Sequence, residues 1–259
     1  MLQCRKEERG TMKKAEISEK HLLLFQEYQH SIPVIYSVLE GQYDGNLFVD
    51  SEHNTQMAVL FTPFAFHFVA GNADFEKVVD VLDQTIFHQY LEETGEKEAI
   101  VFCPDQQWDK VLDEVFAKHH GVKDGRKIFH LNRDRFAQAQ ASRTDLHGLQ
   151  KTLHYEQENG AKSKYLVCRI LDGEACVSYC SGFMSGRGHA EIDVFTEERY
   201  RGKGYAREAS ITLIRALLAS GIEPDWCTWP YRTESEKLAL SIGYELKRTV
   251  PAHIWIENG

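Results

Sequence analysis

The sequence has no apolar run near the roughly 18 to 20 residues that a membrane-spanning helix needs. Its N-terminus is charged and lacks the apolar stretch of a signal peptide, so we expect a cytoplasmic protein with no membrane partner. A basic surplus is also missing, because 39 acidic residues outnumber 30 basic ones and the formal charge is −9. Negative charge opposes attraction to a phosphate backbone, and nucleic acid is therefore not an expected partner.

Paired cysteines are absent too. The six cysteines are scattered, and no two of them form a CxxC pair. A zinc site usually needs Cys or His in pairs at ligand spacing, and a disulfide framework is typical of short secreted chains. We therefore expect free, mostly buried thiols and no metal. His119 and His120 stand at the end of an expected helix, where we interpret them as solvated caps.

The first half of the chain alternates between helical and strand patterns, after a polar, charged stretch at residues 1–11 that is expected to be either a tail or sequence upstream of a true start at Met12. Apolar residues at helical spacing predict an opening helix over 17–28 and a second helix from Phe75 to Tyr90. Asp105 is placed to cap a third helix. Runs of β-forming residues predict strands at 47–49, 57–61, 64–69, 99–102 and 128–131, the first three antiparallel.

The chain turns polar over residues 132–143, and we place a boundary between two halves there, giving segments 12–135 and 136–259. Both halves show the order helix, three strands, helix, strand, helix, strand. This order, without clear residue identity, suggests a duplication. In the second half the pattern predicts helices at 144–158, 204–220 and 234–242, and strands at 165–171, 175–183, 189–196, 226–229 and 244–250.

The segment EIDVFTEERYRGKGYAREA, residues 191–209, carries the clearest chemical signal. A strand pattern passes through a basic, glycine-containing loop into an amphipathic helix. Backbone N–H groups at a helix start attract anions, and Gly202 and Gly204 let a phosphate approach the backbone closely. Arg199, Arg201 and Lys203 add positive charge. The pattern predicts a diphosphate site, and a solvated basic loop is the plain alternative.

Two other nucleotide-binding motifs fit this loop poorly. A P-loop needs GxxxxGK followed by Ser or Thr, which is absent. A Rossmann fingerprint needs GxGxxG within a parallel βαβ unit. Here Gly202 and Gly204 are followed by Tyr205-Ala206-Arg207, and the preceding strands are expected to be antiparallel.

The loop does resemble motif A of the GCN5-related N-acetyltransferase (GNAT) family, in which Gln or Arg precedes two residues, Gly, one residue, and Gly or Ala. Here the motif runs from Arg199 to Gly204, and a later SEKLALSIGYEL resembles motif B. The resemblance covers roughly residues 144–250. The combination PDW at 224–226 with a long divergent N-terminal half looks most like the zwittermicin A resistance acetyltransferase group.

The resemblance implies an α/β (α+β) fold: a GNAT-like mixed, largely antiparallel sheet flanked by helices, here as two tandem GNAT-like halves. The first half has no counterpart of RGKG and is expected to form part of an acceptor cleft without binding coenzyme. The implied enzyme is an N-acetyltransferase (EC 2.3.1.-) that moves an acetyl group from acetyl-CoA, as acyl-donor cosubstrate, to a primary amine of a small molecule. The implied coenzyme-binding residues are Val194, Phe195, Thr196, Arg199, Arg201, Gly202, Lys203, Gly204, Tyr205 and Ala206.

Glu191 is the candidate general base, because it lies on the strand that would face the thioester. Asp193 is the runner-up, since a strand bulge shifts the facing register by a residue. Both could instead be solvent-facing carboxylates. The family's general acid is a Tyr at the position that Ala239 occupies here, which leaves water, Tyr231, Ser235 or no acid at all.

The missing tyrosine keeps a second hypothesis open, a catalytically silent acyl-CoA-binding or sensor module. Trp226 and Trp229 either line the acceptor pocket or pack in the core, and Tyr244 is expected to be core. The acceptor amine, the acyl length and the oligomeric state stay open, a homodimer included.

Overall fold

The computed structural model describes residues 11–74, 77–142 and 144–257. Across these residues the fold is mixed α/β, with twelve mostly antiparallel strands and helices between them. The chain forms two compact units, each assembled from separate stretches of sequence. Unit 1 holds the described residues up to Gln29, then Gly45–Asp124 and those from Pro251 onward, and unit 2 holds His30–Asp44 and Gly125–Val250. No helix within the described ranges is long and apolar enough to cross a membrane.

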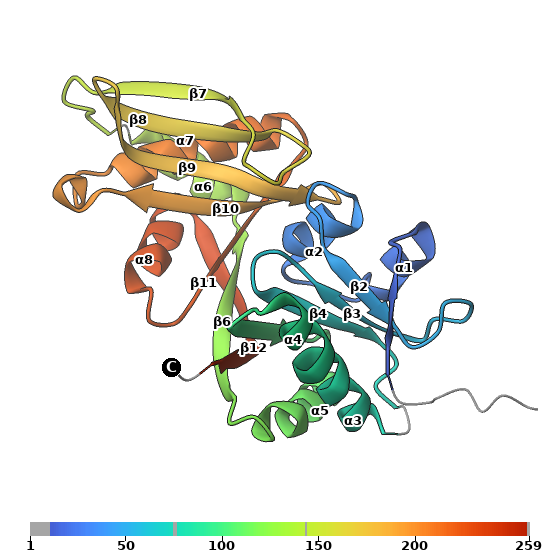
Figure 1. Ribbon diagram of the computed structural model, residues 1–259. Coiled ribbons are helices and arrows are strands. Elements are labelled where there is room, and N and C mark those ends of the chain that lie inside the picture. Colours follow the sequence, from blue (N-terminus) through green and yellow to red (C-terminus); the bar gives the residue numbers. More distant parts are fainter. Residues whose placement is uncertain (1–10, 75–76, 143, 258–259) are drawn as a thin grey trace, which may run out of the picture. The chain divides into compact units, whose positions relative to one another are not determined.

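Unit 1 is built on an antiparallel run of strands (Figure 1). The predicted antiparallel arrangement of the first three strands is confirmed, since Val59 stands opposite both Phe48 and Val69. All five residues of β3 are buried, which explains why its sequence is continuously apolar. In order, the strands are β1(Lys13–Ala15), β2(Asn46–Val49), β3(Met57–Phe61), β4(Phe66–Gly71) and β5(Glu98–Phe102), the last parallel to β4.

The helices of unit 1 follow the predicted pattern with two changes. The opening helix is shorter than expected, α1(Glu19–Leu24). The helix expected from Phe75 to Tyr90 is α3(Val78–Asp83), a π-helical segment η1(Gln84–Tyr90) and α4(Leu91–Thr94), and Phe75 lies outside the described residues. The predicted cap is confirmed, because the Asp105 carboxylate accepts from two backbone N–H groups at the start of α5(Gln106–Ala117).

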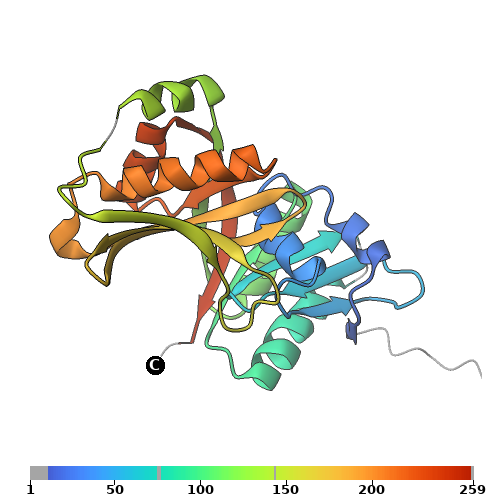
Figure 2. The same cartoon turned by 90° about the horizontal axis from the view of Figure 1, so that it is seen from above.

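Unit 2 carries four antiparallel strands, one more than predicted: β7(Gln150–Glu156), β8(Tyr165–Asp172), β9(Ala175–Gly186) and β10(His189–Thr196). Figure 2 shows α7(Tyr205–Ala219) across one face of them. Leu213, Ile214, Trp226 and Tyr244 are almost fully buried in the core between α7 and the sheet. Core positions for Trp226 and Tyr244 are thereby confirmed. The unit is completed by α2(Ile32–Leu39), α6(Arg133–Ala141), β11(Glu223–Thr228) and α8(Thr233–Ile242).

Each unit takes its closing strand from the other half of the sequence. β6(Val122–Leu131) ends the first half, yet in unit 2 it pairs with β11, with Ile128 opposite Cys227. β12(Tyr244–Ile256) ends the second half, yet in unit 1 its last residues pair with β5, with His253 opposite Val101. The strands predicted at 128–131 and 244–250 were therefore too short, because pairing between distant segments extends them.

One prediction about the middle of the chain was wrong. The segment predicted as a helix at 144–158 contains β7, which pairs with β8 over seven residues. β7 is an edge strand with no fully buried residue, and Leu153 and Tyr155 are exposed, so the strand lacks the alternating burial that marks a half-buried strand. Within the polar stretch, residues 133–141 form α6. Asn132 caps α6 by accepting from the N–H groups of Asp134 and Arg135, and Phe136 is its one buried residue.

The predicted boundary between residues 135 and 136 falls inside α6. The compact units do not coincide with the two sequence halves, since each unit is discontinuous. The division into segments 12–135 and 136–259 stays a prediction about sequence duplication. Five cysteines within the described residues are free, as expected, and Cys4 lies outside them.

Gly243, which ends α8, offers a test of the packing in unit 2. Its φ of 114° is left-handed, and a Cβ there would stand 2.6 Å from the backbone nitrogen of Phe136. We expect Gly243→Ala to lower the free energy of unfolding by about 2 to 4 kcal/mol, the sum of backbone strain and a clash with α6. Urea unfolding followed by circular dichroism measures this loss.

Gly221 is the matched control, since its φ is 74° but nothing lies within 4 Å of a Cβ. Gly221→Ala should lose only the backbone term, about 1 to 2 kcal/mol. Equal losses in the two variants would mean that α6 does not press on Gly243.

Candidate functional site

The loop between β10 and α7 leaves backbone N–H groups at a helix start. Gly204 is the N-cap of α7 with a φ of 83°, and no side chain caps the helix. The first N–H groups of a helix have no partner within it, and the helix dipole adds positive potential there. Gly202 also has a left-handed φ, 76°, and a Cβ at this position would meet nothing within 4 Å. The loop therefore presents open space beside polarised backbone, which suits an anion.

A pocket of about 570 Å³ opens beside this loop, a size typical of small-molecule sites. It extends from the end of β10 to the start of α8, where Arg232, Glu234 and Ser235 line it. Eight of the ten residues expected at the coenzyme site line this pocket: Val194, Phe195, Thr196, Arg201, Gly202, Gly204, Tyr205 and Ala206.

The other two expected residues, Arg199 and Lys203, lie against the ring of Tyr200 instead. Their charged groups are 5.0 and 5.1 Å from its centroid, and Arg199 also pairs with Glu197 at 3.1 Å. Sequence reasoning missed Arg207, which lines the pocket and donates from its guanidinium to the carbonyl oxygens of Ala139 and Ser142. The end of α6 thus holds a cation at the pocket wall, a contact that loop composition could not indicate.

The pocket depends on where β10 and β11 part. Their parallel pairing ends with Glu191 opposite Asp225. Beyond that point β10 continues its register with β9, from Asp193 opposite Ser181 to Thr196 opposite Ser178, after a bulge. Residues 194–196 have no β11 partner and line the pocket, where the carbonyl oxygens of Phe195 and Thr196 accept from the Ser178 hydroxyl and the Arg201 guanidinium.

Glu191 sits at this parting point in a small polar cluster. As a residue, Glu191 is only 6% exposed. It accepts from the Cys227 thiol, with Sγ and Oε1 2.5 Å apart, and Arg126 Nη2 lies 3.8 Å from the same oxygen. The Arg126 guanidinium donates to Cys227 Sγ through Nε and Nη2 at 3.1 and 2.8 Å and lies over the ring of Trp229.

This environment tunes the proton affinity of Glu191. Burial raises its pKa to about 7 from an ordinary 4.5, and the Arg126 charge and the Cys227 hydrogen bond oppose that rise. A carboxyl group that titrates near neutral pH can both take and return a proton under ordinary conditions. Burial also raises the pKa of the Cys227 thiol, which keeps it protonated at rest.

Asp193 points into a second, smaller pocket of about 190 Å³, lined by side chains of β8, β9 and β10 and by Glu158. The Tyr179 hydroxyl donates to the Asp193 carboxylate at 3.0 Å. Arg169 lies in the same pocket, but its charge is balanced by two 2.6 Å hydrogen bonds to Glu156. The pocket therefore combines two carboxylates with tyrosine rings, a setting that suits a cation.

Residue 239, where the family has its general-acid tyrosine, is an alanine that cannot donate a proton. Ala239 is fully buried in the core of unit 2. Tyr231 is 66% exposed, and Ser235 lines the larger pocket and accepts from the indole of Trp226. Sequence reasoning missed Arg126 and Cys227, because neither belongs to a local motif around residue 191.

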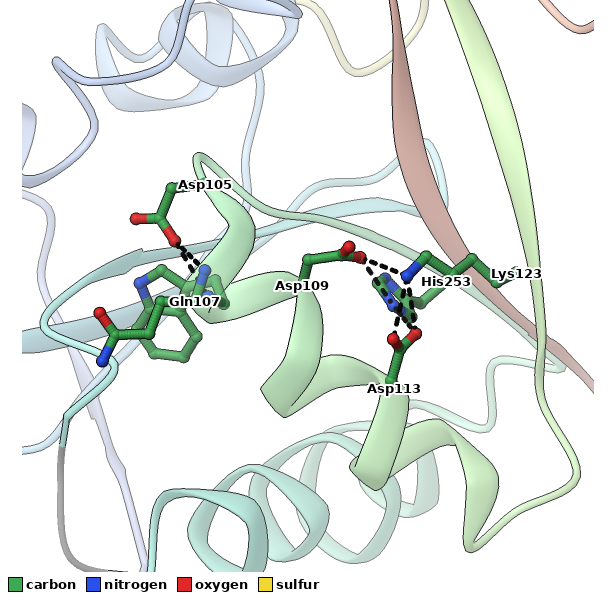
Figure 3. Close-up of polar contacts among 7 residues, drawn as sticks. Asp105, Gln107, Asp109, Asp113, Lys123 and His253 are labelled. Carbon is green, nitrogen blue, oxygen red and sulfur yellow. Dashed lines mark hydrogen bonds and ion pairs between the residues drawn. The ribbon is translucent and has the colours of Figure 1, made fainter.

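Two side-chain groups in unit 1 have ligand types that metals use. In the first, Asp109 and Asp113 face His253, but the Lys123 ammonium already lies 2.7 Å from Asp109 and 2.9 Å from Asp113 (Figure 3).

The second group comprises Asp83, His88 and His119, with His119 Nε2 2.6 Å from Asp83. The His119 side chain is thus hydrogen-bonded to Asp83. The expectation of no metal stays a prediction.

Comparisons with known proteins agree with the resemblance found in the loop. The GNAT acetyltransferase family model matches residues 23–169 and 154–253. The chain is 24% identical over 239 residues to the uncharacterized N-acetyltransferase YdfB of Bacillus subtilis (strain 168), covering 82% of this chain and 85% of that protein.

Solved structures support the fold. A GCN5-related N-acetyltransferase-like protein from Streptococcus suis 89/1591 matches with a TM-score of 0.62 and 22% identity, over 91% of this chain and 97% of that one. A tandem GNAT protein from the clavulanic acid biosynthesis pathway matches with a TM-score of 0.64 and 8% identity, over 96% and 98% of the two chains. The prediction of a mixed α/β, GNAT-like fold is confirmed, and the tandem match supports two GNAT-like halves.

Burial of Glu191 should make stability depend on pH in a defined direction. Because its pKa rises from 4.5 to about 7 on folding, this group stabilises the fold fully below pH 4.5 and loses that contribution as pH rises through 7. The stability of Glu191→Gln relative to wild type should therefore increase by about 3 kcal/mol between pH 4.5 and 8. Urea unfolding across this range measures the difference.

The exposed Glu198 supplies the control, since Glu198→Gln removes one carboxyl charge without removing a buried group. If the wild-type and Glu191→Gln curves run parallel from pH 4.5 to 8, folding does not perturb Glu191.

Proposed function

The chain belongs to the GNAT acetyltransferase family, and from that premise we propose that it transfers an acetyl group from acetyl-CoA to a primary amine of a small molecule. The observation that carries the proposal is the pocket at the start of α7, where the open backbone at Gly202 and Gly204 and the end of β10 line one cavity. Family membership makes the protein an acyltransferase that uses an acyl-CoA donor. The acetyl group and the amine acceptor are our proposal.

The residues present fit such a donor. The uncapped N–H groups of α7 and the guanidinium groups of Arg201, Arg207 and Arg232 favour a diphosphate. The backbone of Val194 and Thr196, on the part of β10 that has no β11 partner, would hold an extended amide-containing arm by hydrogen bonds. In this arrangement the side chains of Lys203 and Tyr205 contribute less than the main chain of the loop.

Glu191 is the proposed general base, with Asp193 as the alternative. An amine must lose its proton to act as a nucleophile, and a carboxylate with a pKa of about 7 is suited to receive that proton at neutral pH. The smaller pocket around Asp193 is the proposed acceptor site. Its two carboxylates and its tyrosine rings would bind the ammonium form of a small amine.

A catalytically silent acyl-CoA-binding module is the second candidate, and the observation in its favour is the buried Ala239 at the acid position.

We also propose a cytoplasmic protein without nucleic-acid or membrane partners, and leave a homodimer open. Within the family we place the chain nearest the zwittermicin A resistance group, on Pro224-Asp225-Trp226 and its long N-terminal half. Steady turnover of acetyl-CoA with a panel of amines separates enzyme from silent module.

A substitution at Gly202 tests whether this loop binds the coenzyme. Gly202→Asp would place a side chain and a negative charge in the open space beside the loop, so acetyl-CoA binding should fall below detection by calorimetry. Gly188 is the matched control, because its φ of 77° and its open surroundings are nearly the same, but it lies in the turn before β10. Gly188→Asp should keep its affinity within about 2-fold of wild type. Unchanged binding in a folded Gly202→Asp protein would remove the loop from the site.

A substitution at Glu191 tests its proposed role as the general base. Glu191→Gln keeps the shape and removes the basicity, so turnover at pH 7 should drop by at least roughly 100-fold with little change in acetyl-CoA affinity. The defect should shrink as pH rises, because more of the acceptor is already neutral. If Glu191→Gln stays active from pH 6 to 9 while Asp193→Asn does not, Asp193 is the base. If both stay active, positioning alone carries the reaction.

A further inference from the structure

The cluster of Asp83, His88 and His119 in unit 1 has the ligand types of a transition-metal site. Each side chain brings one ligand atom to within 4.8 Å of the other two. His88 is exposed, while Asp83 and His119 are half-buried, so the cluster is accessible from solvent. Two imidazoles and a carboxylate with room for a water are the ligands that zinc and the neighbouring divalent transition metals accept.

The backbone places Asp83 and His88 on one side of their helix. In an α-helix, residues five apart point about 140° away from each other. Here α3 ends at Asp83 and the π-helical η1 follows, in which the N–H group of Leu91 donates to the carbonyl oxygen of Ile86, five residues back. A π-helix closes its turn between residues five apart, so this segment brings Asp83 and His88 together. Such segments are rare and occur frequently at functional sites.

Glu92 orients the ring of His88. Its Oε1 lies 3.2 Å from His88 Nδ1, and it follows His88 by four residues. A carboxylate only accepts, so in the neutral imidazole Nδ1 carries the proton and Nε2 keeps its lone pair. Metal-binding histidines almost always donate their other ring nitrogen to such a partner, which fixes the tautomer and the ring orientation.

His119 comes from the turn after α5, the helix that lies beside α3 (Figure 1). Its ring stacks on Phe87 with the centroids 3.7 Å apart, which fixes the plane of the imidazole. His119 Nε2 faces Asp83 Oδ1 at 2.6 Å. Zinc at roughly 2.0 to 2.2 Å from a nitrogen and an oxygen holds them about 3.3 Å apart. The pair therefore has to open by only about 0.7 Å to admit the ion.

The nearest lysine leaves this cluster available, unlike the lysine in the cluster of Figure 3. There Lys123 lies within 2.9 Å of both carboxylates and already takes the place of a cation. Here Lys118 lies 3.0 Å from Asp80 and 3.6 Å from Oδ2 of Asp83, the oxygen that does not face His119. An ion can therefore bind Oδ1 without displacing the ammonium from Asp80.

We propose that Asp83, His88 and His119 bind a zinc ion, with water in the remaining position. The ion joins the helical segment around η1 to the end of α5, and its binding stabilises unit 1 by linkage. This inference does not rest on the proposed function, because none of the three residues lines either pocket of unit 2. It replaces the expectation of no metal, which rested on spacing along the chain, whereas only folding brings residues 88 and 119 together.

The test is calorimetric titration of the untagged full chain with ZnCl2, after treatment with EDTA and dialysis. We expect one zinc ion bound per chain at this site, and an X-ray absorption spectrum with two imidazole nitrogens at about 2.0 to 2.1 Å. An excess of Mg²⁺ or Ca²⁺ should not displace it, because these ions prefer oxygen ligands. Saturating zinc should raise Tm relative to EDTA.

Three variants and a control locate the ion. His88→Ala and His119→Ala should each weaken zinc binding by more than about 100-fold, because each removes a ligand. Glu92→Gln should weaken it by about 10- to 100-fold through the orientation of His88. His53 is the matched control, since it is an exposed histidine of unit 1 between β2 and β3, and His53→Ala should bind zinc like wild type.

Two results would overturn the site. The first is a wild-type chain that binds no zinc up to millimolar concentration, a measurement that needs no variant. The second is equal affinity in His88→Ala and His53→Ala, which would place the ion elsewhere on the chain. Acetyl-CoA binding, measured on the same samples, should be equal in zinc and in EDTA. A failed zinc site therefore leaves the proposed function standing, and failed acetyl-CoA binding leaves the zinc site standing.

Discussion

The end of the pairing between β10 and β11 is the constraint on which the rest of the site depends. Two parallel strands that stayed paired would satisfy each other's backbone groups and leave no room between them. Here the pairing stops at Glu191 and Asp225, and a bulge in the β9–β10 register follows at once. The pocket, the stretch of β10 without a β11 partner and the placement of Glu191 and Cys227 all follow from this separation.

A second consequence is the cost of burying charge at the same point. Glu191 is nearly inaccessible, and the desolvation of its carboxylate is only partly offset by Arg126 and Cys227, so its pKa lies near neutrality. Arg126 is held in turn by Trp229. A fully paired carboxylate would be a weak base, and an unpaired one would stay protonated, so an intermediate degree of pairing is what proton transfer at neutral pH requires.

The two pockets of unit 2 differ in charge in a way that separates donor from acceptor. Arginines and helix-start N–H groups line the larger pocket, which suits phosphate. Carboxylates and tyrosines line the smaller one, where the nearby Arg169 is balanced by Glu156. The overall acidic charge of the chain is therefore compatible with an anionic donor, because local potential at each pocket and not net charge decides which ligand enters.

The sequence by itself determined the elements whose signals are local. The loop from Arg199 to Gly204 could be recognised because helix-start anion binding depends on glycines and a following amphipathic helix that are adjacent in the chain, and the Asp105 cap and the antiparallel strands at 57–71 depended on equally short spacings. The edge strand β7 was mistaken for a helix because it buries too little to show a period of two. Only the tertiary structure decided that β6 pairs with β11 and that β12 pairs with β5, each far from its neighbours in the sequence. Arg126 lies on β6 and is brought to the site by this pairing. No spacing in the chain links residues 126, 191 and 227, since strand pairing between distant segments brings them together, and that pairing depends on packing across the whole sheet.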